Sequence, residues 1–346
     1  MTKKNAIRLA LVLALTIVLL ILSFGKMNWG EAWRFLLKNV RWGMFILVAL
    51  LTPMHMLTRS IRWKYLMNRE KPGVRMYNMF AANAVGFTAS YIFPARIGEL
   101  VKPIYLARQE KCRVGYTLGT CVVERIFDVL TMCLLLALFL LARPLYISTF
   151  NLQEAQVKRL TGLGIIGAAA AVFLFAVCLG CLFFREKALA LAGSLLRFKI
   201  FPEKFRAKAL ELIHEFIDGL KAFRSLRDIL IYLGLSIFVW LGINFYYWIF
   251  FQAFAIKINF FFLLPYLFMT AVGASIPTPG MVGGYHLFSI EAMTMLFGMD
   301  VSRAGGLTIV FHAVQYVVTL VVGFIILWKD GSSLVQIKRL GEAKNP

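Results

Sequence analysis

The sequence predicts an all-α integral membrane protein, built as a polytopic helical bundle. First, 60% of the 346 residues are apolar and only 16% are charged, against about 25% charged in an ordinary soluble domain. Second, long runs contain no Asp, Glu, Lys or Arg, and a membrane span needs about 20 predominantly apolar residues. Third, the 38 Lys and Arg outnumber the 17 Asp and Glu and lie between these runs, as they do in cytoplasmic loops. These features argue against a disordered chain, a soluble enzyme and a nucleic-acid-binding protein.

Six apolar segments are expected to cross the membrane, within a single transmembrane domain that occupies residues 1–346. The predicted spans are residues 9–25, 42–58, 116–141, 160–184, 229–252 and 304–328. The first follows Lys3, Lys4 and Arg8 and so resembles a signal peptide, but no small-x-small cleavage site comes after it. We therefore expect it to remain as the first span.

Two further apolar segments, residues 76–107 and 259–297, contain proline and glycine where a span should be continuous. Proline and glycine at membrane depth free backbone polar groups, which protein or a water-filled cavity must then satisfy. Both segments are therefore predicted to be re-entrant hairpins or broken helices. The predicted breaks are Pro94 and Gly98 in the first segment and Pro277, Pro279, Gly280 and Gly283 in the second.

The distribution of basic residues predicts the orientation. With a cytoplasmic N-terminus, loops on the cytoplasmic side hold 26 Lys and Arg and loops on the outer side hold 9, which agrees with the positive-inside rule. Both termini are then cytoplasmic, and the two hairpins enter from opposite sides. A faint internal repeat agrees, because Ala84-Val85-Gly86 resembles Ala271-Val272-Gly273, and further along Glu124 falls opposite His312. Two interrupted segments in corresponding places of two halves are typical of transporters with inverted repeats.

The longest polar stretch, residues 185–228, contains an amphipathic pattern over residues 203–224. Apolar side chains that recur at helical spacing predict a helix with one apolar face. We expect this helix to lie on the cytoplasmic surface, with its Lys and Arg toward anionic phospholipids. A simple linking helix is an equally good interpretation.

Six charged residues fall at membrane depth: Arg96, Glu99, Lys102, Glu124, Arg125 and Asp128. Each ionised group costs about 2.5–3.5 kcal/mol at the centre of a span, so six would cost roughly 15–20 kcal/mol if they were unpaired. They are therefore expected to pair or to line water, and three positive and three negative charges can neutralise one another. One interpretation is an ion-pair lock between the first hairpin and the Glu124 helix. The other is a polar cavity for a lipid headgroup, with Arg96 or Arg125 on its phosphate. The two are compatible, because a lock that opens when the substrate enters is a gate.

The second hairpin and the last span add Tyr285, His286, His312 and Gln315 to the predicted cavity. Histidines within a membrane can be packing residues or proton carriers, and both interpretations stay open. The sequence contains no metal-binding spacing, no nucleotide-binding loop and no G-x-S-x-G motif. We therefore predict no catalytic residue, no metal and no cofactor.

Three motifs resemble those of the flippase-like transmembrane domain of lysylphosphatidylglycerol synthases. They are Pro94-Ala95-Arg96-Ile97-Gly98-Glu99, Glu124-Arg125-Ile126-Phe127-Asp128 and Pro277-Thr278-Pro279-Gly280-Met281-Val282-Gly283. The resemblance covers nearly the whole chain, but the soluble aminoacyl-transfer domain of the synthases is not part of it. Met281 stands where the family motif has a second glycine, and His286 stands where relatives often carry Glu. These two differences put a carboxylate role for the second hairpin in doubt and suggest a different headgroup preference.

The resemblance implies a bacterial or archaeal inner-membrane protein that moves a lipid between leaflets by alternating access. The cargo would be a phospholipid, an aminoacyl-phospholipid, a hopanoid or a polyprenyl-linked glycan, since stand-alone relatives are linked to hopanoid transport and archaeal glycan assembly. A lipid-synthesising enzyme is a candidate partner. Two alternatives stay open: a membrane-embedded glycosyl- or aminoacyl-transferase acting on a lipid, and an ion or small-solute carrier.

Overall fold

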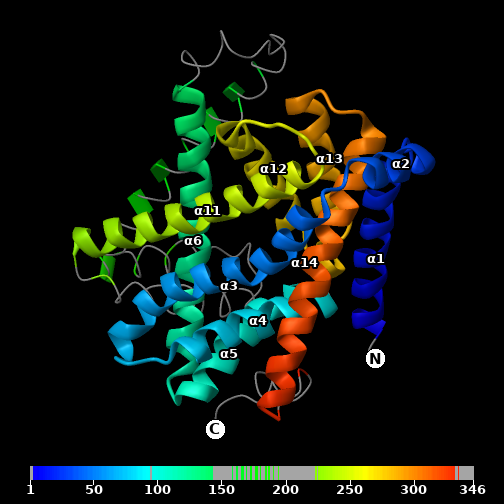
Figure 1. Cartoon of the computed structure of the whole chain (residues 1–346). Helices are drawn as coiled ribbons and strands as arrows, with labels where there is room; N and C mark the ends of the chain where they lie inside the picture. Colours follow the sequence, from blue (N-terminus) through cyan, green and yellow to red (C-terminus); the bar gives the residue numbers. More distant parts are fainter. Residues whose placement is uncertain are drawn as a thin grey trace.

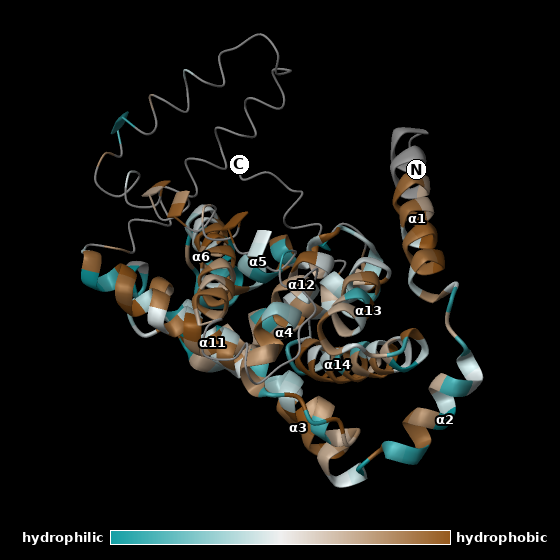
Figure 2. Cartoon of the chain, turned by 90° about the horizontal axis from the view of Figure 1, so that it is seen from above, coloured by the Kyte–Doolittle hydropathy of each residue, from teal (hydrophilic) through white to brown (hydrophobic). Residues whose placement is uncertain are grey.

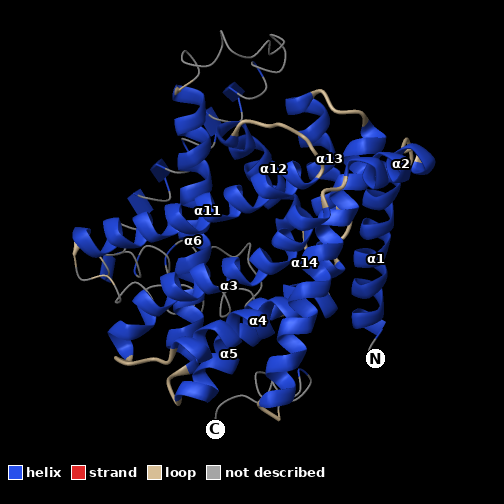
Figure 3. Ribbon diagram, in the orientation of Figure 1, coloured by secondary structure: helices blue, strands red, loops and turns tan. Residues whose placement is uncertain are grey.

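The computed structural model describes residues 3–93, 96–142, 223, 225–331 and 334, together with scattered positions between 158 and 194. Within these residues the secondary structure is helical, with ten α-helices and two short 3-10 helices (Figure 3). The predicted span at residues 160–184 and the amphipathic helix at 203–224 fall largely outside the described residues. The fold class predicted from the sequence, an all-helical polytopic membrane protein, is confirmed.

Helices long and apolar enough to cross a membrane are present in both halves of the chain. Three of the described helices meet this criterion alone: α3 (Trp42–Glu70), α11 (Leu226–Ala253) and α14 (Val301–Lys329). Helices α1 (Lys3–Phe24) and α2 (Trp29–Asn39) meet it as a pair, with a bend of 71° between them. Helix α6 (Val114–Leu141) is 28 residues long, but charged residues interrupt its apolar sequence.

Large apolar side chains lie exposed on the outer helices. Figure 2 shows hydrophobic residues, in brown, along α1, α6 and α11. Leu22 on α1, Leu50 on α3, Phe238 on α11 and Ile325 on α14 are each more than half exposed. So many exposed large apolar side chains are unusual for a water-soluble monomer and are expected where lipid covers a protein. The exposed faces therefore agree with a multi-pass membrane protein.

Each interrupted segment folds into a helical hairpin. Helix α4 (Met76–Ile92) packs against α5 (Gly98–Glu110), and α12 (Leu263–Ser275) packs against α13 (Gly284–Phe297). The 3-10 helix η2 (Phe260–Phe262) precedes α12, and η3 (Pro279–Met281) lies in the turn between α12 and α13. Glycine permits the close approach in both hairpins. A Cβ atom on Gly86 would lie 2.7 Å from Lys102 Cβ, and one on Gly273 would lie 2.7 Å from Phe288 Cβ.

The two hairpins and the helices that follow them share one register along the sequence. Three pairs of equivalent positions are each separated by 187 residues: the packing glycines Gly86 and Gly273, the left-handed residues Lys111 and Gly298 that end α5 and α13, and the helix starts Val114 and Val301. This register extends the faint repeat seen in the sequence. It places Glu124 opposite Phe311, one residue before His312, which is the position expected from the faint repeat.

The two hairpins approach the centre from opposite ends of the molecule. In Figure 1, α6 begins at the lower end, next to α5, whereas α14 begins at the upper end, next to α13. Helix α1 begins and α14 ends at the lower end. The turns of the hairpins meet, because a Cβ atom on Gly280 would lie 3.3 Å from the Tyr91 carbonyl oxygen near the end of α4.

Helix α3 differs from the predicted span at residues 42–58, because it continues without interruption to Glu70. Its apolar face persists past residue 58, where Trp63, Leu66 and Met67 are fully buried. Basic residues occupy other faces of the same turns and include two that are buried. The segment counted as a cytoplasmic loop from its charge is therefore the second half of a long helix.

Candidate functional site

A pair of buried carboxylates on α6 forms the centre of the charged cluster. Glu124 and Asp128 are one helical turn apart and therefore project from the same face. Their relative exposures are 0% and 5%, and the apolar residues Val123 and Phe127 beside them are fully buried. Carboxylates at this depth need positive partners or hydrogen-bond donors, because an unpaired buried charge is very costly.

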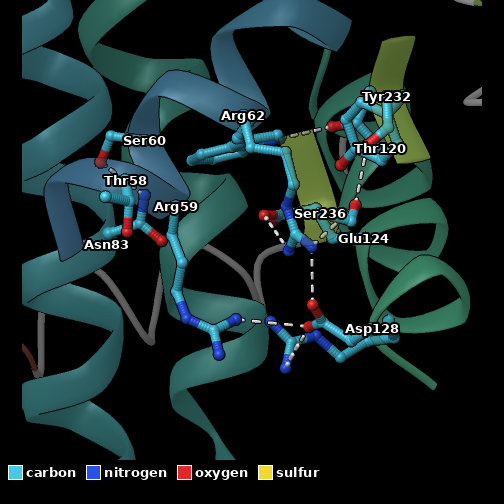
Figure 4. A network of polar contacts seen from close by, with 12 residues as sticks. Thr58, Arg59, Ser60, Arg62, Asn83, Thr120, Glu124, Asp128, Tyr232 and Ser236 are labelled. Atoms are coloured by element: carbon cyan, nitrogen blue, oxygen red, sulfur yellow. Dashed lines mark hydrogen bonds and ion pairs between the residues drawn. The ribbon is translucent and has the colours of Figure 1, made fainter. Parts of the chain in front are cut away.

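Helix α3 supplies two arginines to these carboxylates. Arg62 lies between them, with Nη1 2.7 Å from Asp128 Oδ1 and Nη2 3.3 Å from Glu124 Oε1 (Figure 4). The same Nη1 donates to Ser236 Oγ on α11 at 3.2 Å. Arg59 reaches Asp128 from one turn earlier, with Nη1 3.3 Å from Oδ2. Because the side chain of Arg62 is fully buried and its partners lie on two other helices, it fixes α3, α6 and α11 relative to one another.

Helices α5 and α11 complete the charged cluster. Lys102 on α5 forms an ion pair with Glu124, and its Nζ lies 4.1 Å from the centroid of the Trp63 ring, a cation–π contact. Trp240 on α11 donates from Nε1 to Asp128 Oδ1 at 3.0 Å. Arg125 Nη1 lies 3.3 Å from Asp128 Oδ2. The first hairpin is therefore tied to α6 through Lys102.

Arg96 and Glu99 pair with each other at the edge of the cluster. Arg96 Nη2 is 2.9 Å from Glu99 Oε1, and their side chains are 28% and 43% exposed. Arg96 has a φ of 53° in the turn before α5, a left-handed conformation that costs a non-glycine residue about 1–2 kcal/mol. Together with Arg125, which is 39% exposed, this pair forms the accessible side of the cluster.

The charges of the cluster do not cancel. Its members in the described residues are the cations Arg59, Arg62, Arg96, Lys102 and Arg125 and the anions Glu99, Glu124 and Asp128. The sequence suggests a self-neutralising group of six, and that expectation is wrong because two buried arginines of α3 join it. The excess of two positive charges favours an anion nearby.

A cavity of about 150 Å³ adjoins the cluster at the place where the two hairpins meet. Tyr285, His312 and Gln315 line it, whereas Glu124, Arg125 and Asp128 do not, and Arg59 is the member of the cluster that lines it. The other lining residues come from five helices and the second hairpin turn: His55, Phe87, Tyr91, Trp240, Ile243, Tyr246, Tyr247, Leu267, Thr270, Ala271, Ala274, Met281 and Thr319. The predicted site residues other than His286 are therefore divided between an ion-pair cluster and an aromatic cavity.

The second hairpin is held to α14 by histidine contacts. His312 Nε2 is 3.0 Å from the carbonyl oxygen of Gly280, and its ring stacks on Tyr285 with centroids 5.3 Å apart. The backbone N–H of Gly283 donates to His286 Nδ1 at 3.3 Å, so this nitrogen is unprotonated. The two histidine rings are 4.8 Å apart, and neither ring pairs with a carboxylate of the described residues.

The predicted breaks lie where the hairpins turn. Pro277, Pro279, Gly280 and Gly283 fall in the turn between α12 and α13, with Gly280 at φ 59° and Gly283 at φ 92°. Gly98 begins α5 and packs directly on the backbone of α4. Pro94 lies outside the described residues.

Three residues of α3 that belong to the site, His55, Arg59 and Arg62, are not predicted from the sequence. The charge pattern assigns both arginines to a cytoplasmic loop, because they follow the predicted end of the span at residue 58. A signal was nevertheless present, because residues 55, 59 and 62 recur at helical spacing and so share a face. No group of three or more potential metal ligands occurs among the described residues.

Comparison with known proteins gives one family. The family model described as lysylphosphatidylglycerol synthase TM region matches residues 6–323. Neither a curated protein nor a solved structure matches the chain. The match includes both hairpins, α6 and nearly all of α14.

Proposed function

Because the chain belongs to the lysylphosphatidylglycerol synthase TM region family, we propose that it moves a lipid with a polar headgroup between the two leaflets of the cell membrane. The membrane would be the inner or cytoplasmic membrane, with both termini in the cytoplasm. The headgroup would enter the cavity between the hairpins while the tails stay in the bilayer. The protein would act as a transporter and not as an enzyme.

The observation that supports this proposal most strongly is the cavity at the junction of two oppositely inserted hairpins. A headgroup that crosses the hydrocarbon core needs polar partners at mid-depth, because transfer of a bare polar group costs several kcal/mol. Hydroxyl groups, histidines and the Arg59 guanidinium line this cavity. Interrupted helices of two halves form such midplane sites in other transporters.

The contacts around the cavity suggest which part moves. The Arg62 ion pairs are fully buried, and breaking a buried pair costs about 3–5 kcal/mol. The turn of the second hairpin makes no ion pair among the described residues. It is held by a hydrogen bond from His312 to Gly280 and by packing on Tyr91 and on Leu19 of α1. A neutral hydrogen bond contributes only about 0.5–1.5 kcal/mol. We therefore assign the cluster to the static part of the molecule and the second hairpin turn to the gate.

Lipid movement in proteoliposomes tests the proposed function. Purified protein is reconstituted into vesicles that contain trace lipids with a nitrobenzoxadiazole group on one acyl chain, and dithionite then bleaches the outer leaflet. In vesicles that contain the protein, dithionite should bleach nearly all of the fluorescence of at least one phospholipid or glycolipid. The part of the fluorescence that comes from the inner leaflet should disappear faster than it does in empty vesicles. If no lipid in a broad panel crosses faster, with helical content retained in the vesicles, the proposed function is wrong.

A pair of glycine variants connects the movement to the hairpin turn. Gly280 and Gly298 both have a φ near 60°, so alanine strains the backbone similarly at either position. Only at Gly280 would the added Cβ meet neighbours, Tyr91 and Tyr316, because Gly298 has nothing within 4 Å. Gly280→Ala should slow lipid crossing, whereas Gly298→Ala should leave it near the wild-type rate. Equal rates of lipid crossing for the two variants would mean that the second hairpin turn is not the gate.

A further inference from the structure

The lining of the cavity contains one charged side chain and no carboxylate among the described residues. That side chain is Arg59, and the other polar lining groups are hydroxyls, an amide and two imidazoles. The carboxylates nearest in the cluster are both engaged, Asp128 by three arginines and Glu124 by Arg62 and Lys102. A ligand in the cavity therefore meets positive charge without a negative counterpart.

Arg59 retains most of its hydrogen-bonding capacity. A guanidinium has five N–H donors, and the described residues accept one from Arg59, at Asp128 Oδ2. Its side chain is only 9% exposed, and its Nε is buried without a partner in the described part of the chain. The guanidinium also lies against the aromatic rings of Trp240 and Phe87, 5.2 and 5.9 Å from their centroids. A planar cation that is held by stacking and has free donors is suited to a phosphate group.

The rest of the cavity suits an uncharged group that carries hydroxyls. The hydroxyl-bearing residues Tyr91, Tyr246, Tyr247, Thr270 and Thr319 line it together with Gln315. A cavity near 150 Å³ holds one six-membered ring in other proteins, so the space suits a polyol or a single sugar. An ammonium group would lose its hydration beside Arg59 and gain no carboxylate, which is strongly unfavourable.

We propose that the cavity selects an anionic lipid whose phosphate carries an uncharged, hydroxyl-bearing headgroup, such as a polyol or a sugar, and that it discriminates against aminoacylated lipids. Arg59 holds the phosphate, and the tyrosine and threonine hydroxyls hold the polyol or sugar. This proposal rests on the proposed function, and it concerns only which headgroup the site accepts.

Binding by the purified protein in detergent gives a readout that does not depend on transport. Native mass spectrometry with phosphatidylinositol, phosphatidylglycerol, phosphatidylcholine and lysyl-phosphatidylglycerol ranks the four headgroups on one protein. The first two should bind about tenfold or more tightly than the last, because charge-assisted hydrogen bonds are strong and an unpaired ammonium is costly. Equal or tighter binding of lysyl-phosphatidylglycerol would overturn the proposal, whatever the transport assay shows.

Two substitutions locate the selectivity. Arg59→Gln should reduce the preference for phosphatidylinositol to less than threefold. Lys64→Gln removes one positive charge from the same helix outside the cavity lining and should leave the preference unchanged. Gln315→Glu places a carboxylate in the cavity and should raise the relative binding of lysyl-phosphatidylglycerol several-fold. Should Arg59→Gln fail to fold, Gln315→Glu decides, and an unchanged ranking in that variant counts against the cavity as the headgroup site.

Soluble phosphate esters separate a lipid from a free metabolite. Glycerol 3-phosphate and inorganic phosphate at millimolar concentration should leave the bound phosphatidylinositol in place, because they lack the tails that stay in the bilayer. Displacement by glycerol 3-phosphate at micromolar concentration would identify a site for a soluble ester and overturn the lipid assignment. If all four lipids cross the membrane of the proteoliposomes at one rate, the proposed function holds but the proposed headgroup selectivity is wrong.

Discussion

Replacement of Glu124 by glutamine should destabilise the protein strongly, because it removes one of the two carboxylates that pair with four buried or half-buried cations. Glu124 is fully buried and pairs with Arg62 and Lys102. The amide keeps the shape but leaves the Lys102 ammonium without a counter-charge, at a side-chain exposure of only 10%. Removal of one partner from a buried pair costs about 3–5 kcal/mol, and we expect Glu124→Gln to lower the free energy of unfolding by this amount.

A double-mutant cycle with Lys102→Met isolates the interaction. Lys102→Met leaves Glu124 paired with Arg62, so this change alone should cost less, about 1–3 kcal/mol. In the double variant no unpaired ammonium remains, so its cost should fall below the sum of the single costs by about 1–3 kcal/mol. The measurement is equilibrium unfolding in bicelles by titration with sodium dodecyl sulfate, followed by tryptophan fluorescence.

The ion pair between Arg303 and Glu31 provides the matched control. Its atoms are 3.7 Å apart and its side chains are 52% and 41% exposed, so the cycle of Arg303→Gln and Glu31→Gln should give a coupling energy below about 1 kcal/mol. Additive costs for Glu124 and Lys102, or the same coupling in both cycles, would refute the reasoning. Either result would mean that water or another group, and not the ion pair, satisfies the buried charges.

Three other predictions test the fold. Gly284→Ala should cost about 1–3 kcal/mol, because its Cβ would lie 2.5 Å from the Gly273 carbonyl oxygen, whereas Gly242→Ala on α11, with nothing within 4 Å, should be neutral or stabilising. The Asp300 carboxylate accepts hydrogen bonds from the backbone N–H groups of Ser302 and Arg303 at the start of α14. Partial burial raises the pKa of Asp300, but these hydrogen bonds outweigh the effect of burial and lower the pKa below its ordinary 3.8. Asp300→Ala should therefore cost about 1 kcal/mol in the free energy of unfolding at pH 7, and the cost should shrink as the pH falls through the lowered folded-state pKa, since the cap stabilises only above it. Lys111→Cys and Gly298→Cys, both exposed at equivalent hairpin ends, should react with a membrane-impermeant maleimide from opposite sides of right-side-out vesicles, and labelling from one side would contradict the inverted insertion.

Much of this architecture was readable in the sequence because helix breaks have a local chemical cause. Pro277, Pro279 and Gly280 cannot continue a helix, and the structure has its second hairpin turn at these residues. The repeated Ala-Val-Gly triplets were visible for a related reason, since Gly86 and Gly273 both allow a helix to approach another closely. Glu124 and Asp128 stood out because charges are rare in apolar runs.

The arginines of α3 could not be found by the same reasoning. A basic residue after an apolar run looks identical in the sequence whether it enters a loop or turns inward. Arg59 and Arg62 turn inward because two carboxylates 62 to 69 residues later pair with them. The cavity was hidden for the opposite reason. Tyr246 and Tyr247 lie within an apolar span, and a count that includes tyrosine among the apolar residues takes no account of its hydroxyl.

The different bonding of the two α3 arginines indicates how a rigid cluster can adjoin a variable cavity. Arg62 contacts both carboxylates and Ser236, so its displacement would leave two buried anions short of partners. Arg59 makes one contact with Asp128, at 3.3 Å, and Asp128 keeps Arg62, Arg125 and Trp240 if Arg59 turns away. A phosphate in the cavity could therefore draw the Arg59 guanidinium without unpairing a buried charge. On the proposed function, the headgroup thus gains a strong partner at a small cost to the protein, and the Arg62 ion pairs hold the helices in place while the second hairpin opens and closes.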